Sequence, residues 1–211
     1  MYQPAHFVQN DRTALQALMR AHPLATLITL GPEGLTADPV PLTCDASVGE
    51  HGELRGHVAR ANPLWQHAAG QPVLAVFNGP QAYVTPSAYA TKALTHKVVP
   101  TWNYTVVQAH GVLHAEPDAA WLHTLVSGLT HEHESPRAAP WAVTDAPDDF
   151  VQQMLRAIVG IRIPLTRLVG KWKLSQNRST ADRDGVAATT PDPMLARLVR
   201  DPTALIEETP R

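Results

Sequence analysis

Hydrophobic residues along this chain fall mainly into short runs and two-residue alternations, the patterns of buried and half-buried β-strands. LATLITL (24–30) and TADPVPLT (36–43) flank the turn GPEG, which predicts a hairpin. Pro39 and Pro41 mark its second strand as a sheet edge. We expect further strands at 52–59, 72–79, 81–86, 102–117 and 159–174, with 81–86 pairing back on 72–79 across the turn Asn78–Gly79–Pro80.

Helical periodicity is confined to short segments between these strands. Asp11 and Asp118 are suitable N-cap residues, each followed by apolar positions at helical spacing. Asn62 and Pro63 suit the start of a helix that ends at Gly70. Two amphipathic helices are expected at 148–158 and 192–201, whereas 87–101 and 131–141 are predicted to be irregular.

Together these elements predict a mainly β protein with packed helices (α+β). We expect six or seven antiparallel strands, forming a small β-barrel, and about four short helices. The predicted organisation is one domain over residues 1–190, followed by a C-terminal helix and tail over 191–211.

Composition adds two constraints. Only 17% of the 211 residues are charged, which suggests that some surface is covered by a second subunit or a cofactor. The net charge of −2 argues against a broadly basic nucleic-acid-binding surface. With Cys44 as the single cysteine, no internal disulfide is possible. The sequence shows no signal peptide or membrane-spanning stretch, so a soluble, cytoplasmic protein is expected.

The segment GHVARANPLW (56–65) combines the groups that bind phosphate. A strand carrying His57 is followed by Arg60 and by the predicted helix start at Asn62. Free N–H groups at a helix start and a guanidinium beside them favour an anion. The alternative is that Arg60 pairs with a surface carboxylate.

Two other segments carry cations or flat rings. In KVVPTWNY (97–104), Trp102 and Tyr104 share one strand face and Asn103 takes the other, which suits either a planar ligand or a barrel corner closed by a core tryptophan. In GKWKLSQNR (170–178), Lys171 and Lys173 share a face. These lysines fit either a phosphate contact or a protected strand edge.

A metal site is not expected. HEHE (131–134) lacks the HExxH spacing and a third ligand, so we interpret it as a polar loop. Glycine-rich nucleotide motifs and the esterase motif GxSxG are absent as well, and no catalytic residue is identified.

MYQPAHF at the start, GHVARANPLW, GPQAYVTPSAY, VPTWNYTVVQAHG and GKWKLSQNR together resemble the PaiB family of FMN-binding negative transcriptional regulators. The resemblance implies a flavin-type split β-barrel that acts as a homodimer, with FMN near the subunit interface. It also implies a cofactor site made of His57, Val58, Ala59, Arg60, Ala61, Asn62, Thr101, Trp102, Asn103, Lys171 and Lys173. Ala88 departs from the family, which often has an aromatic residue before Tyr89.

Three functions stay open at this point. A transcriptional regulator would contact DNA through the cations of residues 162–178, namely Arg162, Arg167, Lys171, Lys173 and Arg178. An FMN-dependent, flavin reductase-like enzyme would not need DNA, and His57, His96 and His110 are its acid–base candidates by type. A haem-handling protein of the same fold class is the third.

Overall fold

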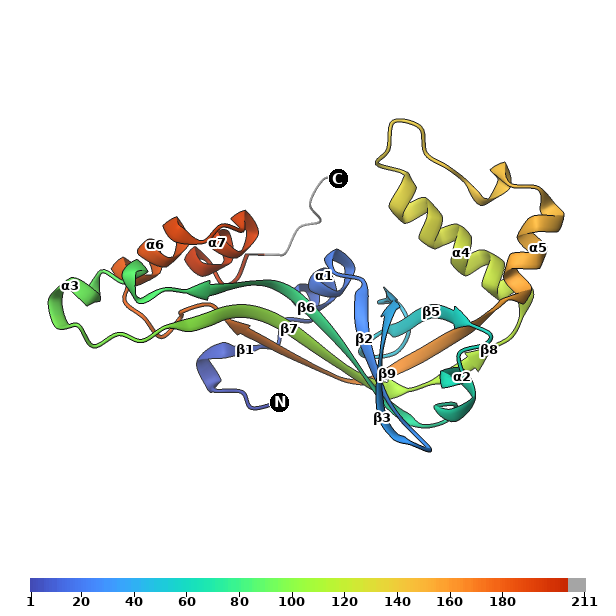
Figure 1. Ribbon diagram of the computed structural model, residues 1–211, viewed down its shortest axis with the longest axis horizontal. Helices are drawn as coiled ribbons and strands as arrows, with labels where there is room; N and C mark the ends of the chain where they lie inside the picture. The colour runs from blue at the N-terminus through green and yellow to red at the C-terminus, as the bar shows by residue number, and fades with distance from the viewer. Residues whose placement is uncertain (205–211) are drawn as a thin grey trace. The chain divides into compact units, whose positions relative to one another are not determined.

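Antiparallel strand pairing organises the structure, a computed structural model in which residues 1–204 are described (Figure 1). The strand order is β3-β2-β6-β7-β9-β5-β4, and β1 and β8 each pair with β9. Six strands have seven or more residues, as expected from the sequence; the short β1 and β4 were not predicted, and the strand expected at 102–117 is divided into β7 and the short β8. The strands are β1 (Val8–Gln9), β2 (Leu24–Gly31), β3 (Gly34–Pro41), β4 (Thr43–Asp45), β5 (Glu53–Ala59), β6 (Pro72–Val84), β7 (Thr101–Val112), β8 (His114–Glu116) and β9 (Ile158–Lys173).

Helices connect and cover these strands. None of the helices within residues 1–204 is both long and apolar enough to cross a membrane. The α-helices are α1 (Arg12–Ala21), α2 (Leu64–His67), α3 (Thr91–Thr95), α4 (Ala119–Glu134), α5 (Asp148–Arg156), α6 (Thr180–Thr189) and α7 (Pro193–Arg200), and the 3-10 turns are η1 (Ala5–Phe7), η2 (Pro86–Ala88) and η3 (Val143–Asp145).

The chain forms two packing units, and β6, β7 and β9 contribute residues to both. Among the described residues, the first unit comprises 1–22, 77–108 and 169–204. Its core is built from α1, α6 and α7 together with the strands, and α7 packs against α6 (Figure 1). Fully buried side chains here include Leu18, Met19, Phe77, Leu174 and Leu195.

The second unit comprises residues 23–76 and 109–168. Its core includes Leu27, Leu54, Leu113, Ile161 and Ile163, all fully buried. The helices α4 and α5 pack against one another, and α4 also contacts β5.

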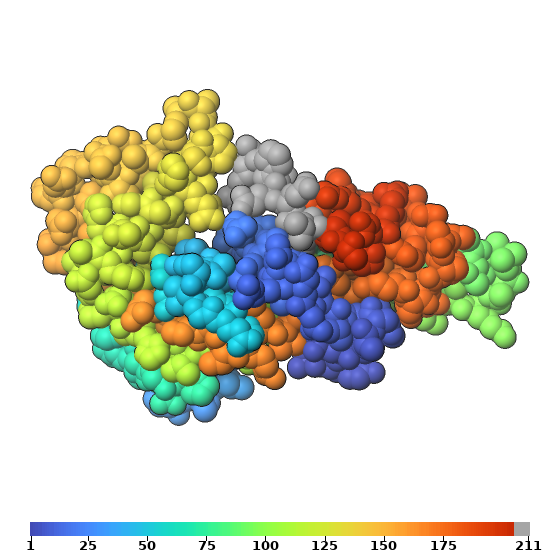
Figure 2. All heavy atoms as spheres, turned by 180° about the vertical axis from the view of Figure 1, so that it is seen from behind, coloured from blue at the N-terminus to red at the C-terminus, as the bar shows by residue number. Residues whose placement is uncertain are grey.

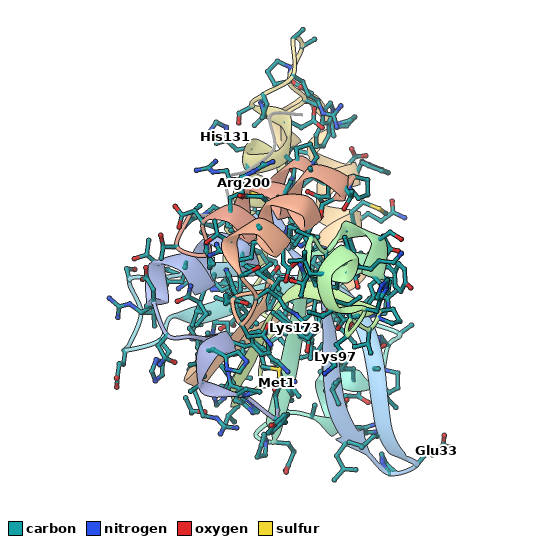
Figure 3. The ribbon with its side chains drawn as sticks, turned by 90° about the vertical axis from the view of Figure 1, so that its left-hand side faces the viewer. Met1, Glu33, Lys97, His131, Lys173 and Arg200 are labelled. Atoms are coloured by element: carbon teal, nitrogen blue, oxygen red, sulfur yellow. The ribbon has the colours of Figure 1, made fainter. Side chains whose placement is uncertain are left out.

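The predicted hairpin and helix caps are confirmed. β2 and β3 pair from Leu24 opposite Pro41 to Gly31 opposite Gly34, and Glu33 lies at the hairpin tip (Figure 3). Gly34 has φ +108°, a conformation that favours glycine. The side chains of Asp11 and Asp118 accept hydrogen bonds from Thr13 N and Trp121 N, at 2.9 and 2.7 Å.

The predicted turn at Asn78–Gly79–Pro80 is wrong, because β6 continues unbroken from Pro72 to Val84. Gly79 is needed for close packing and not for a turn. A Cβ atom there would lie 2.2 Å from Thr105 Oγ1 and 2.8 Å from Leu18 Cδ1. A strand glycine of this kind allows a neighbouring chain to approach closely.

Four helical segments also differ from expectation. The predicted loop at 131–141 begins too early, since α4 continues through HEHE to Glu134. The helix expected to start at Asn62 and Pro63 and to end at Gly70 is a single turn, α2. The short α3 and the ten-residue α6 lie where no helix was predicted. The expected C-terminal helix is confirmed as α7, and residues 205–211 of the predicted tail lie outside the described residues.

Candidate functional site

Lys173, the last residue of β9, ties that strand to the start of β7 (Figure 3). Its Nζ donates hydrogen bonds to Thr101 Oγ1 at 2.6 Å and to the Trp102 carbonyl oxygen at 2.5 Å. The structure therefore brings together three of the residues predicted to hold the cofactor.

Lys171 lies two residues earlier on the same strand and is only 8% exposed. Its Nζ donates to the Tyr2 carbonyl oxygen at 3.1 Å and lies 5.5 Å from the ring centroid of Tyr104. A buried lysine held by one carbonyl and an aromatic face keeps donor capacity, because an ammonium group has three N–H bonds. Of the two alternatives for this lysine, that of a solvent-exposed, protective strand edge is therefore wrong for Lys171.

Arg178 joins this group from the segment after β9. Its guanidinium lies 4.9 Å from the ring centroid of Tyr89, a residue buried beside η2. The Tyr89 hydroxyl is buried and has no hydrogen-bond partner among the described residues. Guanidinium on an aromatic face is a favourable cation–π arrangement.

Lys171, Lys173 and Arg178, which we call the cation cluster, carry like charges close enough to affect one another. Burial lowers the pKa of Lys173, and the charges of Lys171 and Arg178 lower it further. Among residues 1–204, no carboxylate lies within ion-pair distance of any of the three. The nearby Asp182 is hydrogen-bonded by Thr91, and these bonds, with a smaller contribution from the charge of Arg178, lower the pKa of Asp182. Three cations with no ion-paired carboxylate among the described residues are a favourable position for an anion.

The other predicted residues of this region have different surroundings. Asn103 is buried and hydrogen-bonded at 3.1 Å to Ser175, so its amide is already used inside the protein. Trp102 is 53% exposed and meets Tyr83 edge-on at 6.1 Å between ring centroids. The alternative of a core tryptophan at this corner is therefore wrong.

The second predicted group, residues 57–62, lies in the second unit, at the end of β5. His57 is half-buried, its Nδ1 has no partner among the described residues, and burial lowers its pKa. Val58 is buried, while Ala59 and Ala61 are exposed. This histidine is the one group in the segment with an unused buried polar atom.

Arg60 does not pair with a carboxylate among the described residues. Its Nε and Nη2 donate to the carbonyl oxygens of Arg156 and Ile158, at 2.7 and 2.9 Å. The main-chain N–H of Arg60 also donates to Ala157 O at 2.8 Å. Arg60 thus satisfies carbonyls at the C-terminal end of α5, a stabilising position for a cation.

Asn62 makes the side-chain to main-chain hydrogen bond expected at the start of a helix: its Oδ1 accepts from Leu64 N at 2.9 Å. The helix α2 that follows has only four residues and its N-cap position is taken by Pro63, so the expected positive helix start is weak. The Asn62 amide also donates to Asp38 at 3.2 Å, beside a hollow of about 520 Å³ that Glu33 and Asp38 help to line. These acidic groups make the hollow unsuitable for a phosphate.

The candidate histidines do not form a dedicated acid–base pair. His110 contacts the guanidinium of Arg167, and burial followed by that charge lowers the pKa of His110. His96 is exposed and ends α3 in a left-handed conformation, with φ 57°. Residues 1–204 contain no group of three or more potential metal ligands.

Sequence reasoning found both lysines of the cation cluster but placed Arg178 only among possible DNA contacts. The aromatic partners Tyr2 and Tyr89 were not identified, because they are far from Lys171 and Arg178 in sequence. Ala88 is buried against α6, where a Cβ at Gly185 would lie 2.1 Å from the Ala88 carbonyl oxygen. This close approach leaves little room for the aromatic residue that the family often has at position 88.

Comparison with known proteins identifies relatives along nearly the whole chain. A family model described as "Putative FMN-binding domain" matches residues 1–167. An uncharacterized protein of Emericella nidulans is 35% identical over 95% of this chain and 97% of its own length. The "Protease synthase and sporulation protein PAI 2" of Bacillus subtilis is 28% identical over 86% of this chain and 85% of its own length. The resemblance to the PaiB family is thereby confirmed.

Solved structures support the fold. The "FAD and Heme binding protein from Mycobacterium smegmatis" has a TM-score of 0.58 at 17% identity, over 79% of this chain and 73% of that chain. The expected flavin-type split-barrel fold is thus confirmed, while so low an identity says nothing of the ligand.

Proposed function

This chain belongs to the family described as "Putative FMN-binding domain", and on that premise we propose that it binds FMN, with the cation cluster holding the phosphate. The observation that carries this proposal is the gathering of Lys171, Lys173 and Arg178 without an ion-paired carboxylate among residues 1–204. The pKa of Lys173 is lowered by burial and then by the charges of Lys171 and Arg178, and a phosphate dianion would offset that repulsion.

The surroundings of the cluster also fit a flat, partly apolar ligand. Tyr104 and Tyr2 present rings beside Lys171, and Tyr83 and Trp102 present exposed rings. The unpartnered Tyr89 hydroxyl is a further hydrogen-bonding group near Arg178. Stacking faces beside phosphate-binding cations are the combination that a flavin nucleotide requires.

A bound flavin would supply electron and hydride transfer, and the protein would supply binding and orientation. Lys173 would hold the phosphate while its bonds to Thr101 and Trp102 fix the ammonium position. The proposal assigns no acid or base to the chain, since none of His57, His96 and His110 is paired for that role.

We further propose that the protein is a homodimer. Tyr83, Leu94, Val99 and Trp102 are all more than half exposed in the first unit. Large apolar side chains at this exposure are favoured at subunit interfaces. Sedimentation equilibrium, with and without FMN, tests the dimer; a monomer in both conditions would contradict it.

A regulatory function is the second candidate, and it rests on the family resemblance. Two of the five cations predicted to contact DNA already have partners within the protein. Arg162 is paired with Glu53 and Glu116, and Arg167 contacts His110. The remaining cations are those of the cation cluster. DNA and FMN would then compete for the same groups, and salt-dependent DNA binding that FMN displaces would support this function.

The main test is a titration of the purified protein with FMN, FAD and haem, followed by visible absorption and flavin fluorescence. We expect saturable binding of FMN at one site per chain. Riboflavin, which lacks the phosphate, is the matched control and should bind more weakly by about tenfold or more, the loss of one or two charge-assisted hydrogen bonds. Equal affinity for riboflavin and FMN would contradict the phosphate site, and binding of haem alone would contradict the flavin proposal.

A further inference from the structure

A groove in the second unit lies between α4 and the strands β4 and β5 (Figure 2). Its volume is about 740 Å³, within the range of small-molecule sites. Thr43, Asp45 and Arg55 line it from the strands, and Trp121, Gly128 and Glu132 line it from the helix. None of these residues belongs to the proposed flavin site.

Gly128 is the unexpected residue of this groove. It lies in the interior of the 16-residue helix α4, where glycine is unfavourable relative to alanine. A Cβ atom at this position would meet nothing within 4 Å, so packing among the described residues does not require glycine. Its φ is not positive, so the backbone does not require it either. What glycine does provide here is open space in the wall of the groove.

The charges around the groove are arranged to attract a cation. Arg55 is neutralised twice, by Asp45 at 2.9 Å and by the buried Glu53 at 2.8 Å. Glu53 is shared with Arg162, which also pairs with Glu116 at 3.3 Å. This network contains three carboxylates and two guanidinium groups, and hydrogen bonds from Ser47, followed by the charge of Arg55, keep the pKa of Asp45 low.

Glu132 adds another carboxylate to the groove from the helix side, so the carboxylates that line it outnumber its guanidinium. The apolar part of the lining comes from Trp121, Leu125 and Leu129. Trp121 is fixed in place by close packing on β9, because a Cβ at Gly160 would lie 2.5 Å from its ring. The groove thus combines a rigid aromatic wall with carboxylates, which suits an organic cation that carries an apolar group.

We propose that the groove between α4 and β4–β5 binds a small organic ammonium compound with an aromatic or aliphatic group. The ammonium would lie toward Asp45 and Glu132, and the apolar group would lie along Trp121 in the space left open at Gly128. The inference is independent of the flavin site, because it uses neither the cation cluster nor the phosphate.

A pair of probes of similar shape and opposite charge tests this. The protein is titrated with 2-phenylethylammonium and with 3-phenylpropionate, followed by ligand-observed NMR and tryptophan fluorescence. We expect the cation to bind more tightly by roughly tenfold or more, as expected for one well-placed charge contact. The change in fluorescence should be lost in Trp121→Phe. Absence of cation binding, or equal binding of the two probes, would overturn the proposal.

Variants at Gly128 separate occupation of the groove from folding. Gly128→Leu should fill the open space and weaken cation binding by at least roughly tenfold. Gly128→Ala should raise the midpoint of thermal unfolding, because alanine is the better helix former. Glu132→Gln should weaken cation binding several-fold. Glu33→Gln removes a carboxylate at the tip of the β2–β3 hairpin, outside the groove, and is the matched control that should leave cation binding unchanged (Figure 3). Unchanged binding in a folded Gly128→Leu variant would place the cation elsewhere and refute the inference.

Discussion

The ammonium group of Lys173 donates a hydrogen bond of 2.6 Å to the hydroxyl of Thr101, across 72 positions of sequence. The same nitrogen donates to the Trp102 carbonyl oxygen, so the end of β9 is fixed to the start of β7. Lys173 is held in place while its positive charge stays without an ion-paired carboxylate among residues 1–204. A lysine in this state is preorganised for an anion, since its position does not have to change on binding.

Lys173→Met should weaken FMN binding by about 1.5–3 kcal/mol, the range for a charge-assisted hydrogen bond. Methionine keeps much of the apolar stem, so the loss reports the ammonium group. The measurement is a fluorescence titration with FMN and with riboflavin, and only FMN affinity should change. Arg20→Met, which removes an exposed cation from α1 of the same unit, is the control. An equal loss for riboflavin would show that Lys173 does not contact the phosphate.

FMN affinity should depend on pH through Lys173. Its pKa lies below the usual 10.5, because burial and the charges of Lys171 and Arg178 disfavour the protonated form. Phosphate binding favours that form, so the complex takes up protons and affinity falls as pH rises through the lowered pKa. Calorimetry in buffers of different ionisation enthalpy measures the uptake. Lys171→Met should move the fall to higher pH; a shift to lower pH would contradict the assigned repulsion.

Arg60→Ala should lower the free energy of unfolding by about 1–2 kcal/mol, because it removes two hydrogen bonds, one to the Arg156 carbonyl oxygen at the end of α5 and one to the Ile158 carbonyl oxygen at the start of β9. Chemical denaturation measures this, with exposed Arg20→Ala as the control. The same variant also tests whether Arg60 binds phosphate, as the sequence predicts. Unchanged FMN affinity would leave Arg60 with a structural function, whereas a tenfold loss would place the phosphate at residues 57–62.

Acidification should destabilise the protein partly through His57. Burial lowers its pKa below the usual 6.5, so the unfolded chain binds the proton first as pH falls. The contribution of His57 to stability is therefore intact above about pH 6.5 and is lost as pH drops from there toward the lowered pKa. His57→Gln should flatten the dependence of stability on pH in this window. Exposed His131→Gln is the control, and an equal flattening there would contradict the assignment.

Much of the architecture was predictable from the sequence because its signals are local. The GPEG turn, the caps Asp11 and Asp118 and the long β9 pattern each depend on neighbouring residues, and each is confirmed. The lysine pair of β9 was identified for the same reason, since alternation places 171 and 173 on one face.

The errors arose where contacts distant in sequence decide the structure. The carbonyl oxygens that Arg60 satisfies could not be anticipated, because they belong to residues 96 and 98 positions away in the sequence; Arg60 as a phosphate ligand stays a prediction. The partners Tyr2 and Tyr89 were missed for the same reason. HEHE was interpreted as a loop because its four polar residues show no hydrophobic periodicity, although α4 continues through them. Only Leu122 and Leu125 of this helix are buried.

Gly79 is the clearest case of such a distant contact, and Gly79→Ala should destabilise the protein by about 1–3 kcal/mol, the cost of overpacking a filled core. The added Cβ would collide with Thr105 Oγ1 on β7 and with Leu18 on α1, and both neighbours are buried. Thermal and urea unfolding measure the change. Thr105→Ala in the same chain should recover part of the loss, because it removes the nearest atom and its hydroxyl has no partner among residues 1–204. If Asn78–Gly79–Pro80 were the turn expected from the sequence, Gly79→Ala would cost little and Thr105→Ala would not rescue it.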